Sequence, residues 1–181
     1  FLSYSGDYNC KPMNSSQTVV IPDHEAPSGT LSFNHLNTLV LMAENEIKLE
    51  NDYAYSADTD SALAQGIEIG KNLIIDGQEH TIDAGNLARI FRAYSFDLTI
   101  KNIRMINGNS NLPDEKRYYD YSTYGVTAYY NLPSNRNGSA IFSYSRLSIV
   151  NSTFSNNTAL YGGAIYSFSK MDIANSSFTE N

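Results

Sequence analysis

The sequence predicts an all-β fold, a right-handed parallel β-helix that forms a solenoid of about 24–26 residues per coil, with an N-terminal capping helix. Three observations lead to this prediction. A short strand motif recurs along the chain, an Asn or Gly follows it at a fixed offset, and no helix-length apolar pattern separates the copies. A strand repeat with a period of about 20–50 residues is typical of a solenoid. Crossovers between parallel strands are overwhelmingly right-handed.

The strand motif is clearest at residues 147–154 (LSIVNSTF) and 171–178 (MDIANSSF), which begin 24 residues apart. Two apolar residues two positions apart point to one face of an extended chain, and Asn follows four positions after the first. Weaker copies begin at Ile47, Leu73 and Leu98. Asn and Gly enter the left-handed region most readily, so we expect one repeated backbone corner. This structural ladder consists of Asn51, Gly77, Asn102, Asn151 and Asn175.

Composition fits a single domain of 181 residues, with a leader segment over residues 1–30 and a β-helix over 31–181. Hydrophobic residues make up 41% and charged residues only 17%, with a net charge of −7. No basic cluster indicates a nucleic-acid partner, and the longest apolar run, residues 39–43, is too short for a membrane segment. Cys10 is alone and is interpreted as an inert thiol. Because the chain begins with Phe1, we expect a processed chain or part of a longer one.

Residues 1–30 lack periodicity, whereas residues 32–43 have the apolar spacing of an amphipathic helix. Phe33, Leu36 and Val40 fall on one face, and Ser32 is a suitable N-cap. The open end of a β-solenoid would pair with other chains, and an amphipathic helix is a usual cover. We therefore expect helix 32–43 to cap the N-terminal end.

The first coil begins near Ile47 and continues into residues 52–65, which we interpret as a solvated acidic loop containing Asp52, Asp58 and Asp60. Their spacing does not fit a calcium-binding EF-hand loop. The next coils are expected over residues 66–84, 88–109, 138–157 and 162–181. His80 is expected at the stacking position that later coils give to Met105, Phe154 and Phe178.

Residues 110–138 interrupt the repeat with a tyrosine-rich insertion, which we interpret as an excursion rather than an added coil. Tyrosine joins a flat apolar face to a polar tip, so it suits binding to sugars and protein surfaces. The opposing interpretation is that the rings pack onto the flank of the solenoid. The candidate binding residues are Tyr118, Tyr119, Tyr121, Tyr124, Tyr129 and Tyr130.

Short motifs in the repeat resemble a known family. Gly162–Ile165 (GGAI) and Phe178–Asn181 (FTEN) match the paired GGAI and FxxN motifs of the chlamydial polymorphic outer-membrane protein (Pmp) family, and Phe154–Asn157 is a second FxxN. The run over residues 75–83 (IDGQEHTID), with the segments after it, resembles adhesin-like surface proteins of methanogenic archaea. The resemblance covers residues 30–109 and 138–181. It implies a secreted or cell-surface β-helix used in adhesion, without the chlamydial C-terminal barrel.

An enzyme of the β-helix class, a polysaccharide lyase or glycoside hydrolase, would need clustered acids near a sugar bond. Asp76 and Asp83 fit turn positions better than catalytic ones, and the serines are too numerous to single one out. We therefore expect no catalytic residue, no cofactor and no metal site. The remaining residues considered for catalysis are His80, Arg89, Arg92, Asp97 and Arg104.

Asn-x-Ser/Thr sequons occur at five positions. Asn151 and Asn175 belong to the predicted ladder, where stacked amides would resist modification. The glycosylation candidates are therefore Asn137, Asn14 and Asn156, with Asn137 preferred because it lies in a predicted loop.

These features predict an extracellular adhesin-like module that displays a binding surface to a glycan or protein on a host or neighbouring cell. One alternative is a subunit of a surface filament or sheath, which would assemble by strand addition and self-associate through its open C-terminal end. The other alternative is the carbohydrate-active enzyme described above.

Overall fold

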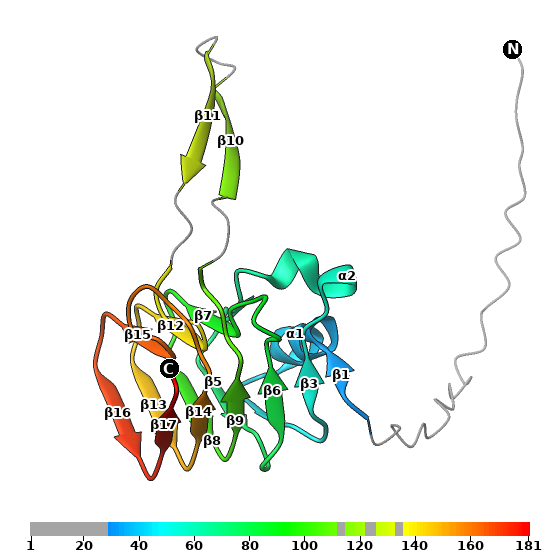
Figure 1. Cartoon of the computed structure of the whole chain (residues 1–181), viewed down its shortest axis with the longest axis vertical. Coiled ribbons are helices and arrows are strands. Elements are labelled where there is room, and N and C mark those ends of the chain that lie inside the picture. The colour runs from blue at the N-terminus through cyan, green and yellow to red at the C-terminus, as the bar shows by residue number, and fades with distance from the viewer. Residues whose placement is uncertain (1–28, 112–114, 122–125, 133–135) are drawn as a thin grey trace, which may run out of the picture.

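The computed structural model describes residues 29–111, 115–121, 126–132 and 136–181. Its architecture is mostly β, with three parallel sheets, one antiparallel hairpin and few helices (Figure 1). The predicted leader over residues 1–30 falls almost wholly outside these ranges, as do Cys10 and Asn14.

Each parallel sheet takes its strands from widely separated parts of the sequence. The first sheet has the order β1 (Leu31–Ser32), β3 (Tyr53–Ala54), β6 (Thr81–Asp83), β9 (Arg104–Ile106), β14 (Thr153–Ser155), β17 (Ser177–Thr179). The second has the order β2 (Glu46–Lys48), β5 (Leu73–Asp76), β8 (Leu98–Lys101), β13 (Leu147–Val150), β16 (Met171–Ala174). The third has the order β4 (Ile67–Glu68), β7 (Phe91–Ala93), β12 (Ile141–Ser143), β15 (Ile165–Ser167).

Along the chain, the strands of these sheets follow a fixed cycle: second sheet, first sheet, third sheet. The sets β5–β6–β7, β8–β9–β12 and β13–β14–β15 each complete one cycle, and β16–β17 begin another. The registers place residues of one kind in columns. In the second sheet Ile75 pairs with Ile100, Ile100 with Ile149 and Ile149 with Ile173. The repeat seen in the sequence therefore corresponds to vertical alignment between strands.

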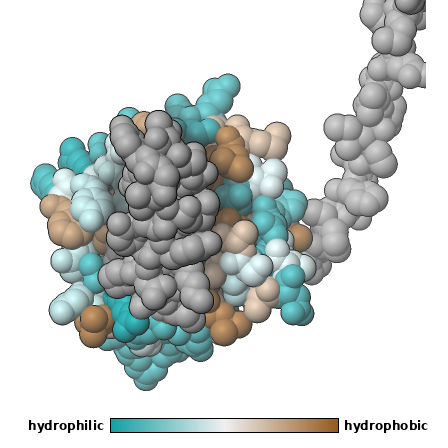
Figure 2. Space-filling model, turned by 90° about the horizontal axis from the view of Figure 1, so that it is seen from above, coloured by the Kyte–Doolittle hydropathy of each residue, from teal (hydrophilic) through white to brown (hydrophobic). Residues whose placement is uncertain are grey.

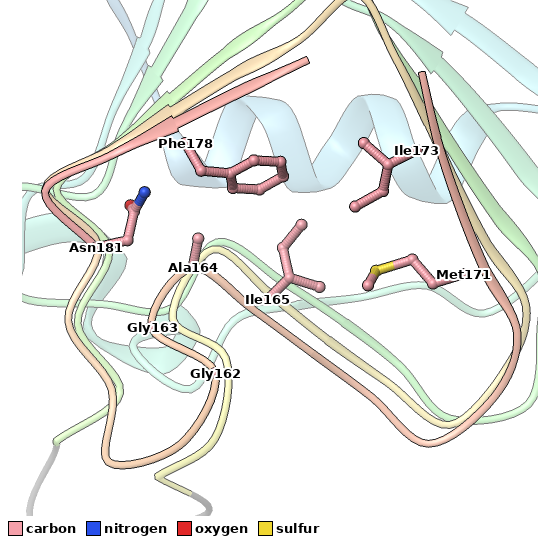
Figure 3. Close-up of a pocket in the computed structure, with 8 residues that line it drawn as sticks. All are labelled: Gly162, Gly163, Ala164, Ile165, Met171, Ile173, Phe178 and Asn181. Atoms are coloured by element: carbon pink, nitrogen blue, oxygen red, sulfur yellow. The ribbon is translucent and has the colours of Figure 1, made fainter. Parts of the chain in front are cut away.

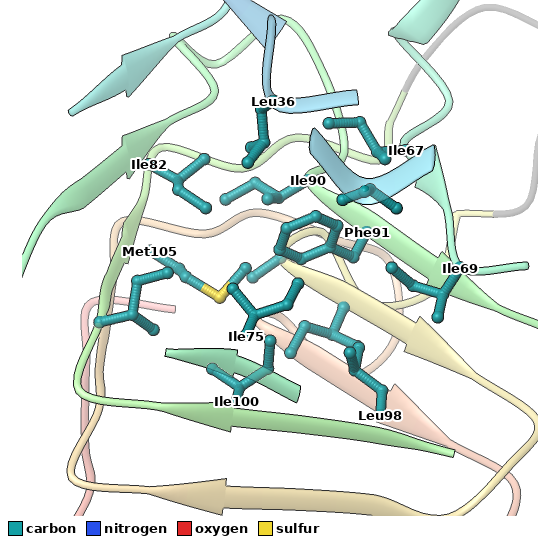
Figure 4. Close-up of a cluster of buried hydrophobic side chains, with 14 of the residues drawn as sticks. Leu36, Ile67, Ile69, Ile75, Ile82, Ile90, Phe91, Leu98, Ile100 and Met105 are labelled. Carbon is teal, nitrogen blue, oxygen red and sulfur yellow. The ribbon is translucent and has the colours of Figure 1, made fainter. Parts of the chain in front are cut away.

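The core is an apolar column between the sheets (Figure 4). Ile75 and Ile100 come from the second sheet, Ile82 and Met105 from the first, and Phe91 from the third, and all five are fully buried. Full burial of one such side chain contributes about 1.5–3 kcal/mol. The apolar residues that recur at two-residue spacing are therefore the main source of stability.

Helix α1 (Phe33–Met42) confirms the helix predicted over residues 32–43. The Ser32 side chain accepts a hydrogen bond from His35 N at 3.2 Å, as expected of an N-cap. Phe33, Leu36 and Val40 are buried against the strands. Figure 4 shows Leu36 beside the side chains of the first coils.

The prediction of a solvated acidic loop is wrong for Asp60. Residues 52–65 contain a short helix α2 (Ala57–Asp60) and a 3-10 helix η1 (Ser61–Leu63). Asp60 is fully buried, and its carboxylate accepts hydrogen bonds from Phe33 N (3.2 Å), Asn34 N (3.0 Å) and Ser56 N (3.0 Å). A carboxylate at the positive end of a helix dipole is stabilising. Asp60 therefore fixes the start of α1, while Asp58 remains exposed.

Three members of the predicted ladder form a column of left-handed corners. Asn102, Asn151 and Asn175 have φ values of 53°, 53° and 49°. The Asn151 side-chain amide donates to Asn102 Oδ1 at 3.3 Å, and Asn102 Nδ2 donates to Asp76 Oδ1 at 3.0 Å. In the coil before Asn102, the side chain that continues this row of hydrogen bonds is therefore the carboxylate of Asp76 rather than another amide.

Gly77 lies in register with Asn102, as the ladder prediction requires. The predicted left-handed corner is wrong for both Asn51 and Gly77, because neither has a positive φ. The left-handed residues of that turn are Gln78 and Glu79. Gly77 is still needed at the corner, since an added Cβ would lie 2.6 Å from the carbonyl oxygen of the next coil's corner residue. In the first coil, Leu49 follows β2 at the level of Gly77, so Asn51 lies outside the column.

The tyrosine-rich segment forms a separate antiparallel hairpin of β10 (Glu115–Tyr121) and β11 (Val126–Leu132) (Figure 1). β9, which precedes it, pairs directly with β14, which follows it. Isolated bridges join Asn109 to Thr158 and Asn137 to Tyr161. The hairpin therefore occupies the place that a short connection between the first and third sheets takes in the next coil.

Candidate functional site: an aromatic stack and an apolar end face

An exposed column of aromatic rings follows the third sheet. Tyr94, Tyr144 and Phe168 each come one residue after a strand, namely β7, β12 and β15. The ring centroids of Tyr94 and Tyr144 are 5.9 Å apart and those of Tyr144 and Phe168 are 4.4 Å apart, the latter pair nearly parallel at 2°. We call these three residues the aromatic stack. They are 41%, 47% and 55% exposed, so solvent reaches all three.

A second aromatic layer lies against the aromatic stack. Phe142 and Tyr166 pair in register on β12 and β15, and their rings stack at 6.2 Å and 14°. Phe142 is fully buried and meets Tyr144 edge-on at 5.1 Å. Tyr166 likewise meets Phe168 edge-on at 5.0 Å. Such contacts each contribute about 0.5–1.5 kcal/mol beyond burial, so the two layers hold each other in one orientation.

A buried cation joins this aromatic cluster to the segment that returns from the hairpin. Arg89 Nε donates to the carbonyl oxygen of Gly138 at 2.9 Å, and its Nη atoms donate to those of Gln65 and Asn137, each at 3.1 Å. The Arg89 guanidinium carbon lies 5.5 Å from the centre of the Phe142 ring. Burial lowers the pKa of Arg89 to about 10, so it stays charged at neutral pH. Arg89 therefore secures the chain next to the rings.

The predicted binding tyrosines lie on the hairpin. The register pairs Tyr118 with Tyr129, and Arg117 with Tyr130. Tyr124 lies outside the described residues.

The last strand of each parallel sheet carries apolar side chains that converge on one another (Figure 3). Met171, Ile173 and Phe178 are 41%, 44% and 41% exposed, although Leu147, Ile149 and Phe154 one coil below are fully buried. We call the surface formed by Ala164, Ile165, Met171, Ile173, Phe178 and Asn181 the end face.

The FxxN asparagines stabilise this end of the structure. Asn157 is fully buried, and its Oδ1 accepts from Gly108 N at 2.9 Å while its Nδ2 donates to Asn181 Oδ1 at 2.8 Å. Asn181 Nδ2 donates in turn to the Phe154 carbonyl oxygen at 3.0 Å. The rings Phe154 and Phe178 stack at 4.8 Å and 7°. The Phe positions of the FxxN motif therefore form a stack of rings, and the Asn positions form a chain of hydrogen-bonded side-chain amides.

The acidic residues considered for catalysis are held by turns. Asp76 Oδ1 accepts from Gln78 N, and Asp83 Oδ1 accepts from Gly85 N at 2.8 Å. Asp97 Oδ1 accepts from Arg146 N at 3.2 Å. Within the described ranges, no group of three or more His, Cys, Asp or Glu residues could hold a metal ion. These contacts assign the acids a role in the backbone turns.

His80 does not take the predicted stacking position. Ile82 pairs with Met105, and Met105 pairs with Phe154, so Ile82 fills that column. His80 Nδ1 instead lies 3.1 Å from Asp52 Oδ1. The extra residues in the turn after Gly77 shift the register by two, which the spacing in the sequence did not reveal.

The glycosylation candidates differ in accessibility. Asn137 is half-buried, and the serine of its sequon, Ser139, is buried and donates to the carbonyl oxygen of Gly163 at 2.9 Å. Asn156 is exposed, as is Thr158 in its sequon. Asn14 is outside the described residues. The folded chain therefore presents the sequon of Asn156 better than that of Asn137.

Comparisons with family models, with curated proteins and with solved structures gave no match for this chain. Within the described part of the chain, no helix has both the length and the apolar character needed to cross a membrane.

The aromatic stack was not among the residues chosen from the sequence, although a signal for it exists. Tyr94, Tyr144 and Phe168 each lie three residues after the first residue of a third-sheet strand, Phe91, Ile141 or Ile165. The offset becomes visible only once those strands are aligned.

Proposed function

We propose that this chain is an extracellular adhesin-like module, a right-handed parallel β-helix that presents an aromatic surface to a glycan or protein on another cell. The cyclic order of the three sheets and the aligned registers support the β-helix. The resemblance of the GGAI and FxxN repeats to surface proteins supports the cell-surface location. In such a module the stacked coils act as a rigid support, and recognition depends on the residues they display.

The observation that carries this proposal is the exposed aromatic stack of Tyr94, Tyr144 and Phe168. Rings that are held rigidly by neighbours lose little conformational freedom on binding. Arg92, which pairs with Glu68 at 3.2 Å, lies beside them, with its guanidinium carbon 5.9 Å from the centre of the Tyr94 ring. Aromatic rings with a nearby arginine are the side chains most enriched at binding hot spots.

The surface around the hairpin is otherwise mixed. In the view of Figure 2, hydrophobic side chains are separated by hydrophilic ones rather than joined in one wide patch. A compact aromatic site such as the aromatic stack suits recognition of a glycan or a small protein epitope better than formation of a broad hydrophobic interface.

An enzyme is supported less well, because Asp76, Asp83 and Asp97 are each engaged by turn backbone. A filament built by strand addition is also supported less well. Such a filament needs two complementary ends on each subunit. Helix α1 packs on the first coils through its own buried residues Phe33 and Leu36.

The proposal is tested by screening the 181-residue chain against glycan and cell-surface protein arrays. A variant with Tyr94→Ser, Tyr144→Ser and Phe168→Ser removes the aromatic stack. Loss of a hot-spot side chain costs about 2 kcal/mol or more, so binding should weaken by at least about 30-fold. The matched control replaces Leu41 and Met42, exposed apolar residues on α1, by Ser and should bind like the parent.

A separate variant that replaces the hairpin tyrosines by Ser measures the contribution of the hairpin. Equal binding by the parent and the aromatic-stack variant would overturn the proposal. Release of unsaturated or reducing ends from acidic polysaccharides would favour the enzyme instead.

A further inference from the structure

The aromatic stack presents the edges of its tyrosine rings to solvent rather than their faces. Tyr144 lies in the middle of the column, and its ring is stacked on those of Tyr94 and Phe168, at interplanar angles of 27° and 2°. Because β12 lies between β7 and β15 in the third sheet, these two neighbours cover opposite faces of the Tyr144 ring. Tyr144 is nevertheless 47% exposed. The part of its ring that solvent reaches is therefore the edge, which carries the hydroxyl group.

The ring of Tyr94 is covered on both faces in a similar way. One face is turned towards Tyr144. The guanidinium carbon of Arg92 lies over the ring, 5.9 Å from its centre. Arg92 is held by Glu68 at 3.2 Å, and Glu68 belongs to β4, on the opposite side of β7 from β12. The arginine therefore lies over the face that is turned away from Tyr144, and Tyr94 also presents an edge.

Ring edges and ring faces attract different groups. An aromatic ring is electrostatically negative on its faces and positive at its edge. A sugar that stacks on an aromatic ring places weakly positive C–H groups on a free ring face, and neither Tyr94 nor Tyr144 offers such a face. A second aromatic ring instead places its negative face against a positive edge, which gives the T-shaped arrangement. The outward edges therefore favour aromatic side chains over sugars.

The inward edges of the same two tyrosines already make this contact within the fold. The rings of Tyr144 and Phe142 are 5.1 Å apart at 87°, and those of Tyr94 and Phe142 are 5.9 Å apart at 68°. Because both faces of each tyrosine are occupied, the edge in each contact is that of the tyrosine. Phe142 is fully buried. The outward edges are the positions at which a partner can repeat the arrangement.

We propose that the aromatic stack binds an extended segment of a protein partner in which alternate side chains are aromatic. This inference deepens the proposed function and rests on it. Alternate side chains of an extended segment lie on one side, about 6.6 Å apart. That spacing is close to the 5.9 Å between the ring centroids of Tyr94 and Tyr144. Each aromatic ring of the partner lies with its face against the outward edge of one tyrosine.

Three synthetic peptides, titrated into the 181-residue chain and followed by nuclear magnetic resonance, test this proposal. Each has a Gly-Ser background with two identical residues at alternate positions, which are phenylalanine, cyclohexylalanine or pentafluorophenylalanine. Cyclohexylalanine keeps the size and the apolar character but has no aromatic quadrupole, and fluorination reverses the sign of the quadrupole. Two edge-to-face contacts should make the phenylalanine peptide bind about 10-fold more tightly than the cyclohexylalanine peptide. The pentafluorophenylalanine peptide should bind most weakly.

Variants of the chain locate the contact. Tyr144→Leu should weaken binding of the phenylalanine peptide about fivefold, whereas Tyr144→Phe keeps the ring edge and should bind like the parent. The matched control is Tyr161→Leu, at a tyrosine that precedes β15 and is 60% exposed, and it should also bind like the parent. Circular dichroism establishes that all three variants are folded. Equal affinity for the three peptides, no binding of the phenylalanine peptide at millimolar concentration, or equal binding by Tyr144→Leu and Tyr161→Leu would overturn the proposal.

The array screen separates this inference from the proposed function. Protein ligands that are lost in the aromatic-stack variant would support both. If every ligand that depends on the aromatic stack is a glycan, the inference about ring edges fails while the proposed function stands. If no ligand of either class depends on the aromatic stack, the proposed function itself fails.

Discussion

Replacement of Asp60 by alanine tests how α1 is attached to the strands. The carboxylate accepts hydrogen bonds from the N–H groups of Phe33 and Asn34, the first two residues of α1, and from Ser56. Ser32 binds the third N–H group of the helix, that of His35. Helix α1 therefore starts with its N–H groups satisfied by side chains, two of them by one buried carboxylate.

The size of the effect follows from these contacts. A buried donor left without a partner costs about 1–3 kcal/mol, and loss of an N-cap costs about 0.5–2 kcal/mol. The Phe33 N–H is buried, whereas water can reach the other two groups in part. We therefore expect Asp60→Ala to lower the free energy of unfolding by about 3 kcal/mol. Asp60→Asn keeps one acceptor oxygen and should cost about half as much.

Urea unfolding followed by far-ultraviolet circular dichroism measures this loss. The control is Asp58→Ala, an exposed acid in the same short helix α2; surface changes of this type usually stay within about 0.5 kcal/mol. Hydrogen exchange should also show α1 opening before the sheets in Asp60→Ala. If Asp60→Ala and Asp58→Ala are equally stable, the assigned capping role is refuted.

Three further predictions concern the columns and corners of the fold. Phe154→Ala should lower the free energy of unfolding in urea by about 3–5 kcal/mol, as expected for a buried phenylalanine. Phe178→Ala should lower it distinctly less, because Phe178 is 41% exposed. Equal losses would contradict the assignment of Phe154 to the core and of Phe178 to the exposed end of its column. Gly138→Ala should lower the melting temperature by several degrees, because φ is 54° and a Cβ would collide with a backbone carbonyl, while Gly70→Ala meets open space and should not. Burial raises the pKa of Asp76, but hydrogen bonds from Asn102, Gln78 and Lys101 outweigh it and hold the pKa below the usual 3.8. The ionised Asp76 carboxylate therefore stabilises the fold above pH 3.8, and this stabilisation disappears as the pH falls through the lowered pKa. The difference in free energy of unfolding between the parent and Asp76→Asn should shrink from pH 5 to pH 2. A difference that stays constant over this range would refute the role assigned to the carboxylate.

The repeat in the sequence located most of the strands. Paired apolar residues such as Leu147 and Ile149 predicted both the strand and its buried face, because side chains alternate along an extended chain. The same periodicity reasoning placed α1. Strand and helix periodicity are local properties, so they can be predicted without knowing which residues of other coils lie next to them.

The sequence failed where turn length and strand register were not visible. His80 was placed by counting from neighbouring copies of the motif, but the turn after Gly77 is longer than the turn after Asn102. Asn51 was placed by aligning Ile47 with Leu73, whereas Ile47 pairs with Ile75. Asp60 was assigned to solvent because the sequence does not show which distant groups meet it. Two of its three partners, the N–H groups of Phe33 and Asn34, are 27 and 26 residues away.

By itself, the sequence determined a mostly β chain with a repeat of about 24 residues, the positions of its apolar columns and the interruption by a tyrosine-rich segment. Only the tertiary structure decided which residues meet across the repeat: Asp60 with the start of α1, Arg89 with the return from the hairpin, and Tyr94 with Tyr144 and Phe168. The physical reason is that strand periodicity depends on neighbours two residues apart. Contacts between coils depend instead on the length of every turn in between.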